Sequence, residues 1–236
     1  MRILLAGGSG GLGRATVELL TTEGAHLVVS YLSNAARAEE LRTLSPDIEI
    51  VQADITKQED RDRLLSAAGP IDGLVVFTGN PARVAAAAQM EQQMIASHAV
   101  NYLGPLLLAR EAAERMKQSK IAGSIVLFST MQGVALFSGS TAYAGVKAAL
   151  IHGARILAKE LRAPHNIRVN VIAPGIIDSG MAQVSIRSGK YDKFISDETI
   201  SRFGRGGDIA RAVRFLLEPD SYVTGQVISV DGGITL

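Results

Sequence analysis

Short apolar runs, rich in valine, isoleucine and leucine, alternate along the chain with longer stretches of helical character. The runs are almost continuously apolar, as expected of strands that are covered on both faces of a parallel sheet. Each gap up to the sixth run is long enough for a crossover helix. We therefore expect an α/β fold of the Rossmann type, with a doubly wound parallel sheet of seven strands and helices on both faces. The expected strands are Arg2–Ala6, Ala25–Ser30, Ile48–Gln52, Gly73–Phe77, Ser124–Phe128, Arg168–Ile172 and Gln226–Val230.

The composition favours one ordinary domain and narrows the classes of function. The 236 residues contain no internal repeat or linker, so we expect a single domain over 1–236. The absence of cysteine and a net charge of only +1 argue against disulfides, thiolate chemistry and nucleic-acid binding. No run of about 18 apolar residues is present, and the first apolar run is too short for a signal peptide. We expect a cytoplasmic protein without a membrane partner. The four histidines are scattered, so no metal site is expected.

A glycine-rich segment, Ala6–Gly13, joins the first expected strand to a helix expected over Gly13–Thr22. Glycines at 7, 11 and 13 allow the backbone to turn tightly and to approach a pyrophosphate closely. The helix start then offers free N–H groups and the positive end of its dipole. A flexible turn without a ligand is the alternative. Because a strand precedes the segment and a helix follows it, the pattern predicts a nucleotide site.

The end of the second expected strand bears on the choice of cofactor. Proteins that bind NAD commonly place an acidic residue there, where it bonds the ribose 2′-hydroxyl. This chain has no Asp or Glu between Val29 and Glu39. Ser33, Asn34 and Arg37 could instead receive a 2′-phosphate, as could Arg14. The alternative is that these are solvated loop residues. The pattern favours NADP(H), with NAD(H) as the other candidate.

Tyr143 and Lys147 are four residues apart in the helix expected over Tyr143–Leu161, so they share one face of it. A phenol ordinarily ionises near pH ~10, and a nearby ammonium group is expected to lower that pKa. Such a tyrosine can donate a proton to a carbonyl oxygen or accept one from an alcohol. Most pairs with this spacing are ordinary contacts on a helix surface. The nucleotide site at the start of the chain favours the catalytic interpretation.

Four further polar residues lie where parallel sheets bind ligands or within apolar surroundings. Asp54 follows the third strand and could accept a hydrogen bond from an adenine amino group, or could cap the helix that follows. Asn101 lies in an apolar helix, either as a hydrogen-bonded core residue or as a site residue. Ser129 and Thr130 follow the fifth strand, at the carboxyl edge of the sheet. Successive residues of an extended segment point to opposite sides, so only one of these two hydroxyls can face a substrate.

Taken together, these residues resemble the short-chain dehydrogenase/reductase family, in its single-domain branch, over nearly the whole chain. Within that family the chain is similar to the 3-oxoacyl-carrier-protein reductase group. The glycine segment is similar to Thr-Gly-x-x-x-Gly-x-Gly, and Asp54, Asn101, Thr130, Tyr143 and Lys147 fall at functional positions of the family. The other matching motifs are Pro174-Gly175 with Ser179, Phe215-Leu216-Leu217, Thr224-Gly225-Gln226 and Asp231-Gly232-Gly233.

The resemblance implies an oxidoreductase that reduces a ketone, or oxidises a secondary alcohol, by hydride transfer with NADP(H). Tyr143 would be the general acid, Thr130 would bond the substrate oxygen, and Lys147 would bond the nicotinamide ribose and keep Tyr143 acidic. Asn101 would complete a proton path. The substrate would be a small carbonyl or alcohol compound, free or carrier-bound. The implied cofactor-binding residues are Gly7, Ser9, Gly11, Leu12, Gly13, Ser33, Asn34, Arg37, Asp54, Ile55, Gly79, Tyr143, Lys147, Pro174, Gly175, Ile177 and Ser179.

Three departures from the family pattern stand out. Ala6 replaces a threonine whose hydroxyl would brace the glycine turn, Val76–Gly79 replaces Asn-Asn-Ala-Gly, and Thr130 replaces serine.

Two other functions compete with the ketone reductase. One is an NAD-dependent alcohol or diol dehydrogenase, and the other is a catalytically silent nucleotide-sensing protein on the same fold.

Two further expectations concern the substrate cover and the assembly. We expect a short substrate lid near 186–207, where the chain is polar and flanked by glycines. We also expect a homo-oligomer, most simply a tetramer. The helices over Met94–Gln118 and Tyr143–Leu161 carry more apolar surface than one sheet can cover, and the family pairs them in a four-helix interface.

Overall fold

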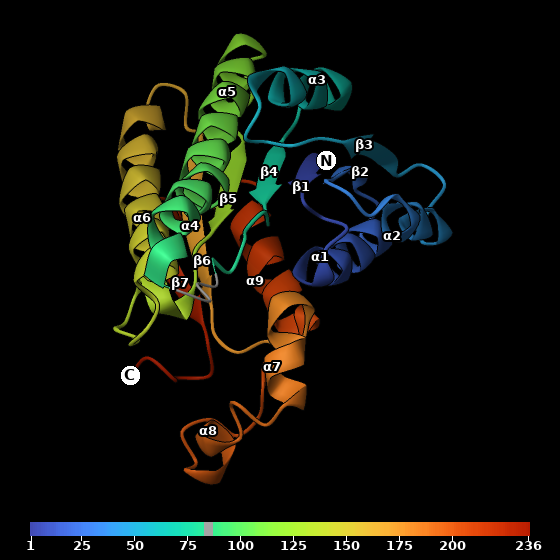
Figure 1. Ribbon diagram of the computed structural model, residues 1–236. Coiled ribbons are helices and arrows are strands. Elements are labelled where there is room, and N and C mark those ends of the chain that lie inside the picture. The colour runs from blue at the N-terminus through green and yellow to red at the C-terminus, as the bar shows by residue number, and fades with distance from the viewer. Residues whose placement is uncertain (83–86) are drawn as a thin grey trace.

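A computed structural model describes residues 1–82 and 87–236 (Figure 1). Its sheet is seven-stranded, and every pair of neighbouring strands is parallel, in the order β3-β2-β1-β4-β5-β6-β7. The expected fold class is confirmed. The strands lie within two residues of the expected limits. They are β1 Arg2–Ala6, β2 His26–Tyr31, β3 Glu49–Gln52, β4 Gly73–Val76, β5 Ser124–Phe128, β6 Arg168–Pro174 and β7 Val227–Val230.

Helices cover the sheet on both faces and enclose two apolar cores. One core joins the sheet to helices α3, α5 and α6. The other joins it to α1 and α9 and to the short helical turn at Leu41. The helices are α1 Gly11–Thr22, α2 Ala35–Glu39, α3 Gln58–Ala68, α4 Met90–His98, α5 Gly104–Gln118, α6 Thr141–Leu161, α7 Gln183–Arg187, α8 Lys193–Ser196 and α9 Gly206–Leu217.

Two expected helices are interrupted. The helix expected over Ala35–Leu44 divides into α2 and a 3₁₀ turn over Glu40–Thr43. The helix expected over Met94–Gln118 contains a π-helical turn over Ala99–Leu103, between α4 and α5. Pro105 follows that turn and has no N–H, so it cannot donate the α-helical hydrogen bond to the Asn101 carbonyl. The chain therefore leaves α-helical geometry at Asn101.

The strand order places four loops at one edge of the sheet. The chain runs outward from β1 to β3 and then returns to start the other half of the sheet at β4. In such sheets ligands bind beyond the carboxyl ends of the strands, where the order reverses. The segments that follow β1, β4, β5 and β6 all meet there. They contain the glycine segment, Gly79, Thr130 and Pro174.

Candidate active site

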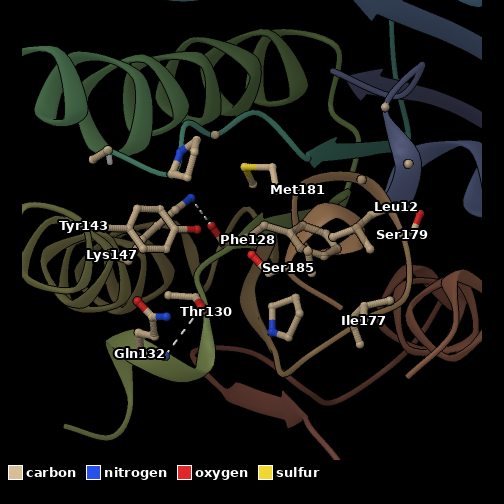
Figure 2. A pocket seen from close by; sticks show the side chains of 18 of the residues that line it. Leu12, Phe128, Thr130, Gln132, Tyr143, Lys147, Ile177, Ser179, Met181 and Ser185 are labelled. Carbon is tan, nitrogen blue, oxygen red and sulfur yellow. Dashed lines mark hydrogen bonds between the residues drawn. The ribbon is translucent and has the colours of Figure 1, made fainter. Parts of the chain in front are cut away.

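A cavity of about 1000 Å³ opens at this edge of the sheet. Its wall combines the glycine turn, the end of β2, the exits of β4, β5 and β6, the start of α6, and residues from 180 to 194. Figure 2 shows side chains from these elements pointing into one space. Three predicted site residues, Asn101, Asp54 and Ile55, do not line it. All the others do: Gly7, Ser9, Gly11, Leu12, Gly13, Ser33, Asn34, Arg37, Gly79, Thr130, Tyr143, Lys147, Pro174, Gly175, Ile177 and Ser179.

The glycine turn is packed so closely that side chains are excluded at two positions. A Cβ atom on Gly13 would lie 2.4 Å from the Gly8 carbonyl oxygen. A Cβ atom on Gly11 would lie 2.4 Å from the Gly180 nitrogen. Helix α1 begins at Gly11 without a side-chain cap, so its first N–H groups have no partner from a capping side chain. This arrangement suits a phosphate group.

Ser30 supplies the brace that the missing threonine at position 6 would otherwise provide. Its hydroxyl accepts a hydrogen bond from the Gly7 N–H at 3.0 Å, and its side chain is buried in β2. The sequence prediction missed this residue, because the contact joins two strands that are 23 residues apart. The turn is therefore held from β2 as well as from β1, where the Leu5 carbonyl accepts a hydrogen bond from the Gly8 N–H at 3.1 Å.

The end of β2 presents one cation to the cavity. Arg37 lines the cavity, and its guanidinium forms no ion pair within the described part of the chain. Arg14, the other predicted cation, pairs with Glu18 and with Glu40, at 3.1 Å each. Asn34 caps α2 by accepting a hydrogen bond from the Arg37 N–H at 2.9 Å. Arg37, and not Arg14, is the basic residue available to a phosphate here.

Asp54 and Ile55 lie beside the cavity but outside its wall. The Asp54 carboxylate accepts hydrogen bonds from the Thr56 N–H at 3.0 Å and from the Thr56 hydroxyl at 2.7 Å. It stabilises the turn that precedes α3 but does not cap that helix, whose N-cap residue is Lys57 and has no side-chain cap. Ile55 is buried, and its carbonyl accepts from Arg61. A contact between Asp54 and adenine stays a prediction.

Tyr143 and Lys147 extend from α6 and line the cavity (Figure 2). Lys147 is 2% exposed, and its ammonium group donates to the Phe128 carbonyl at 2.7 Å. Burial lowers the pKa of Lys147 to about 7. Burial also raises the pKa of Tyr143 to about 12, and the neighbouring Thr130 hydroxyl acts in the opposite direction.

The expected lowering of the Tyr143 pKa is therefore wrong for this arrangement. The Lys147 ammonium is directed at a backbone carbonyl and is itself disfavoured by burial, so loss of solvent around the phenol dominates. A raised pKa keeps the phenol protonated at neutral pH. That state suits a proton donor.

The two hydroxyls after β5 have different partners. Ser129 donates to the Lys147 carbonyl at 3.0 Å and holds α6 against the sheet. Thr130 accepts only a long hydrogen bond, 3.4 Å, from the Gln132 N–H, and it lies next to Tyr143 at the cavity. Gln132 also lines the cavity and accepts a hydrogen bond from the Ser140 hydroxyl. The sequence prediction did not single out Gln132.

Asn101 is buried behind the cavity and connects three elements. Its side chain bonds both backbone groups of Asn80, at 3.0 and 2.9 Å, and donates to the Ser97 hydroxyl at 3.0 Å. Ser97 in turn donates to the Ala142 carbonyl at 2.8 Å, one residue before Tyr143. The exit of β4 is thereby tied to the first turn of α6. Ser97 was missed, although its i, i+4 spacing to Asn101 was visible in the sequence.

The outer wall comes from residues 180–196, which we call the cap segment. It contains α7 and α8, and Figure 1 shows α8 at an end of the molecule away from β2 and β3. The lid expected near 186–207 shares residues 186–196 with this segment, and its last residues, from 206 onward, belong to α9. The cap-segment residues that line the cavity are Gly180, Met181, Ala182, Ser185, Lys190, Tyr191, Lys193 and Phe194.

Comparison with known proteins agrees with this geometry. The sequence model of a family described as Enoyl-(Acyl carrier protein) reductase matches residues 6–235. The 3-oxoacyl-[acyl-carrier-protein] reductase of Mus musculus is 32% identical over 234 residues, which cover 98% of this chain and 96% of the mouse protein. The chain belongs to the short-chain dehydrogenase/reductase family. The expected family resemblance is confirmed, and the family is one of oxidoreductases.

Solved structures of short-chain dehydrogenases/reductases superpose on nearly the whole chain. A short-chain type dehydrogenase/reductase from Mycobacterium ulcerans has a TM-score of 0.88 at 26% identity, covering 99% of this chain and 89% of that one. A 4-hydroxyisoleucine dehydrogenase, solved in complex with NADH, has a TM-score of 0.89 at 25% identity and covers 100% and 99%.

No helix among the described residues is long and apolar enough to span a membrane. Within 1–82 and 87–236, no cluster of three or more His, Asp or Glu side chains is placed to hold a metal ion.

Proposed function

We propose that this protein is an NADP(H)-dependent oxidoreductase that reduces a ketone to a secondary alcohol, or runs the reverse reaction. The observation that carries the proposal is the meeting of Thr130, Tyr143 and Lys147 in the cavity that also contains the glycine turn. The glycine turn and the start of α1 would hold the pyrophosphate. Pro174 to Ser179, and Lys147, would hold the nicotinamide half.

The bound nicotinamide would supply the hydride chemistry, and the residues of the chain would orient the ketone and supply a proton. In the reduction, the carbonyl carbon gains a hydride and the carbonyl oxygen gains the Tyr143 proton. Thr130 would donate a hydrogen bond to the same oxygen. Tyr143 can serve as the donor because its phenol is protonated at neutral pH and lines the cavity beside Thr130.

Asn101 would serve the proton path through its backbone. The amide oxygen of its side chain is already bonded to Asn80, and the amide nitrogen is bonded to Asn80 and Ser97. The backbone carbonyl of Asn101, by contrast, would be bonded in an α-helix by the N–H of residue 105. That residue is Pro105, which has no N–H to donate. A water molecule bonded to that carbonyl is the simplest route by which Tyr143 would regain a proton.

The preference for NADP(H) is supported by the charge around the end of β2. Arg37 and Ser33 line the cavity there, and none of its described lining residues is acidic. The 2′-phosphate of NADP(H) would form a charge-assisted bond with Arg37. The free 2′-hydroxyl of NAD(H) would have no carboxylate there to accept its hydrogen bond. The NADH-bound dehydrogenase among the structural neighbours favours the second candidate, an NAD-dependent alcohol or diol dehydrogenase.

The deciding experiment follows NADPH consumption with a panel of ketones and β-ketoacyl thioesters, including carrier-bound ones, as the name of the mouse relative suggests. We expect turnover with NADPH and tighter binding of NADPH than of NADH. Tighter binding of NADH would assign the protein to the NAD-dependent candidate. Cofactor binding with no turnover of any carbonyl would favour a nucleotide-sensing protein instead.

The proposed assembly is a cytoplasmic homotetramer built on α4, α5 and α6. Apolar side chains on α4, on α6 and on the π-helical turn that precedes α5 are exposed in the single chain, with exposed fractions of 41% for Met94, 66% for Ile95, 42% for Leu103 and 47% for Ile156. Exposed apolar side chains grouped on adjacent helices mark an interaction surface. A second copy of the chain would bury them.

A further inference from the structure

The cavity wall carries basic side chains but no acidic ones. Among the described residues that line it, the basic residues are Arg37, Lys147, Lys190 and Lys193, and none is Asp or Glu. A cavity lined by charge of one sign concentrates ligands of the opposite sign. The ligands of this cavity are therefore expected to be anions along its whole length.

The cofactor accounts for only half of this charge. Arg37 lies at the end of β2, where a 2′-phosphate would bind. Lys147 lies beside Tyr143 and is bonded to the Phe128 carbonyl. Lys190 and Lys193 belong instead to the cap segment, near α8, which lies away from β2 and β3 (Figure 1). Both line the cavity from the cap segment, which follows β6 and α6 in the chain and is separate from the loop after β2 that contains Arg37.

The two lysines of the cap segment have no acidic partner in the described part of the chain. Each ammonium group lies over the ring of the next residue, at 5.6 Å from the Tyr191 centroid for Lys190 and 5.2 Å from the Phe194 centroid for Lys193. A cation–π contact restrains an ammonium group and leaves its charge uncompensated. Both rings also line the cavity.

We propose that the substrate carries an anionic group, a carboxylate or a phosphate, that binds Lys190 and Lys193 while its carbonyl lies against Tyr143 and Thr130. This inference rests on the proposed ketone reduction and adds the chemical class of its substrate. Keto acids and phosphate-bearing thioesters both fit. Lysine binds either anion as a point charge on a flexible stem, without the fixed geometry that arginine requires.

The test compares substrates that carry the same acetoacetyl group and differ in charge. One pair is acetoacetate and its methyl ester, and the other is acetoacetyl coenzyme A and acetoacetyl-N-acetylcysteamine. The kcat/KM with NADPH is measured for wild type, Lys190→Gln, Lys193→Gln and the double variant. Arg187→Gln is the matched control, because Arg187 is an exposed basic residue of the same segment that does not line the cavity.

We expect the anionic member of at least one pair to be preferred, and the pair that shows it distinguishes carboxylate from phosphate. Each lysine variant should reduce that preference about two- to fivefold, and the double variant about tenfold, with the neutral member unaffected. Arg187→Gln should change neither. The preference should also weaken as salt is added, since exposed charges are screened.

Three results would overturn the inference. Equal use of charged and neutral members in both pairs would refute it and leave the ketone reduction intact. If the lysine variants lower kcat/KM equally for the charged and the neutral substrate of a pair, these residues shape the cavity without binding an anion. If NADPH is bound but no member of either pair consumes it, this inference fails, while the proposed ketone reduction is decided separately by the wider ketone panel.

Discussion

Replacing the two neighbouring hydroxyls after β5 separates the proposed catalytic role from a structural one. Thr130→Val keeps the shape of the side chain and removes its hydroxyl. Within the described residues the Thr130 oxygen accepts one hydrogen bond, at 3.4 Å, so the free energy of unfolding should fall by less than about 1 kcal/mol. Turnover should fall by about 10²-fold or more, as when an oxyanion donor is lost.

Ser129→Ala should show the opposite profile. Its hydroxyl bonds the Lys147 carbonyl at 3.0 Å in a buried site, so its loss should lower the free energy of unfolding by about 1–1.5 kcal/mol. For a chain of this size that corresponds to a fall in Tm of roughly 2–6 °C. Turnover should fall by less than about tenfold, which is one 1.4 kcal/mol step in activation free energy.

Initial rates of NADPH consumption and thermal melts, measured on the same preparations, complete this test. Thr130→Ser is the matched control, because it retains the donor and should stay active. A larger loss of turnover in Ser129→Ala than in Thr130→Val would assign the substrate hydroxyl to Ser129. It would show that the side of the segment facing the substrate had been wrongly assigned.

Three further predictions concern Lys147, the cofactor and the assembly. Because burial lowers the pKa of Lys147 to about 7 from 10.5, the unfolded chain binds more protons than the folded one between these values. Denaturant titrations should therefore show the stability of wild type rising relative to Lys147→Met from pH 7 to 10; a constant difference would contradict the lowered pKa. Tyr31→Asp, at the end of β2, should shift relative binding from NADPH towards NADH in fluorescence titrations, and an unchanged ratio would remove the 2′-phosphate from this loop. Light scattering at micromolar concentration should give the mass of an oligomer, with a tetramer expected, and a monomer would refute the proposed interface.

The sheet could be predicted from the sequence because its signals are local. Each strand is a short apolar run, and the glycine segment lies between one strand and one helix. The Ser30 brace could not be predicted, because the Ser30 hydroxyl of β2 meets the Gly7 N–H only in the folded sheet. It also decides where an acid can be placed to test cofactor choice. Ser30 is buried on Gly7, so Tyr31 is the better position.

Most of the residues predicted for the candidate site line the cavity, but their electrostatics could not be predicted. The spacing of Tyr143 and Lys147 correctly placed both on one helix face at the cavity. The direction of the Tyr143 pKa shift was wrong, because burial cannot be deduced from a four-residue spacing. The connection from Asn101 through Ser97 to α6 depends on a π-helical turn, which no periodic pattern reveals.

The proton-donor role of Tyr143 is the central claim, and Tyr143→Phe tests it most directly. The substitution removes only the phenolic hydroxyl and keeps the ring that packs in the cavity. The measurement is NADPH consumption under saturating ketone, paired with a fluorescence titration of NADPH on the same protein. We predict that turnover is nearly abolished while the Kd for NADPH is unchanged. Retention of more than about a tenth of wild-type turnover would contradict this account, because a general acid contributes about 10²–10⁴-fold.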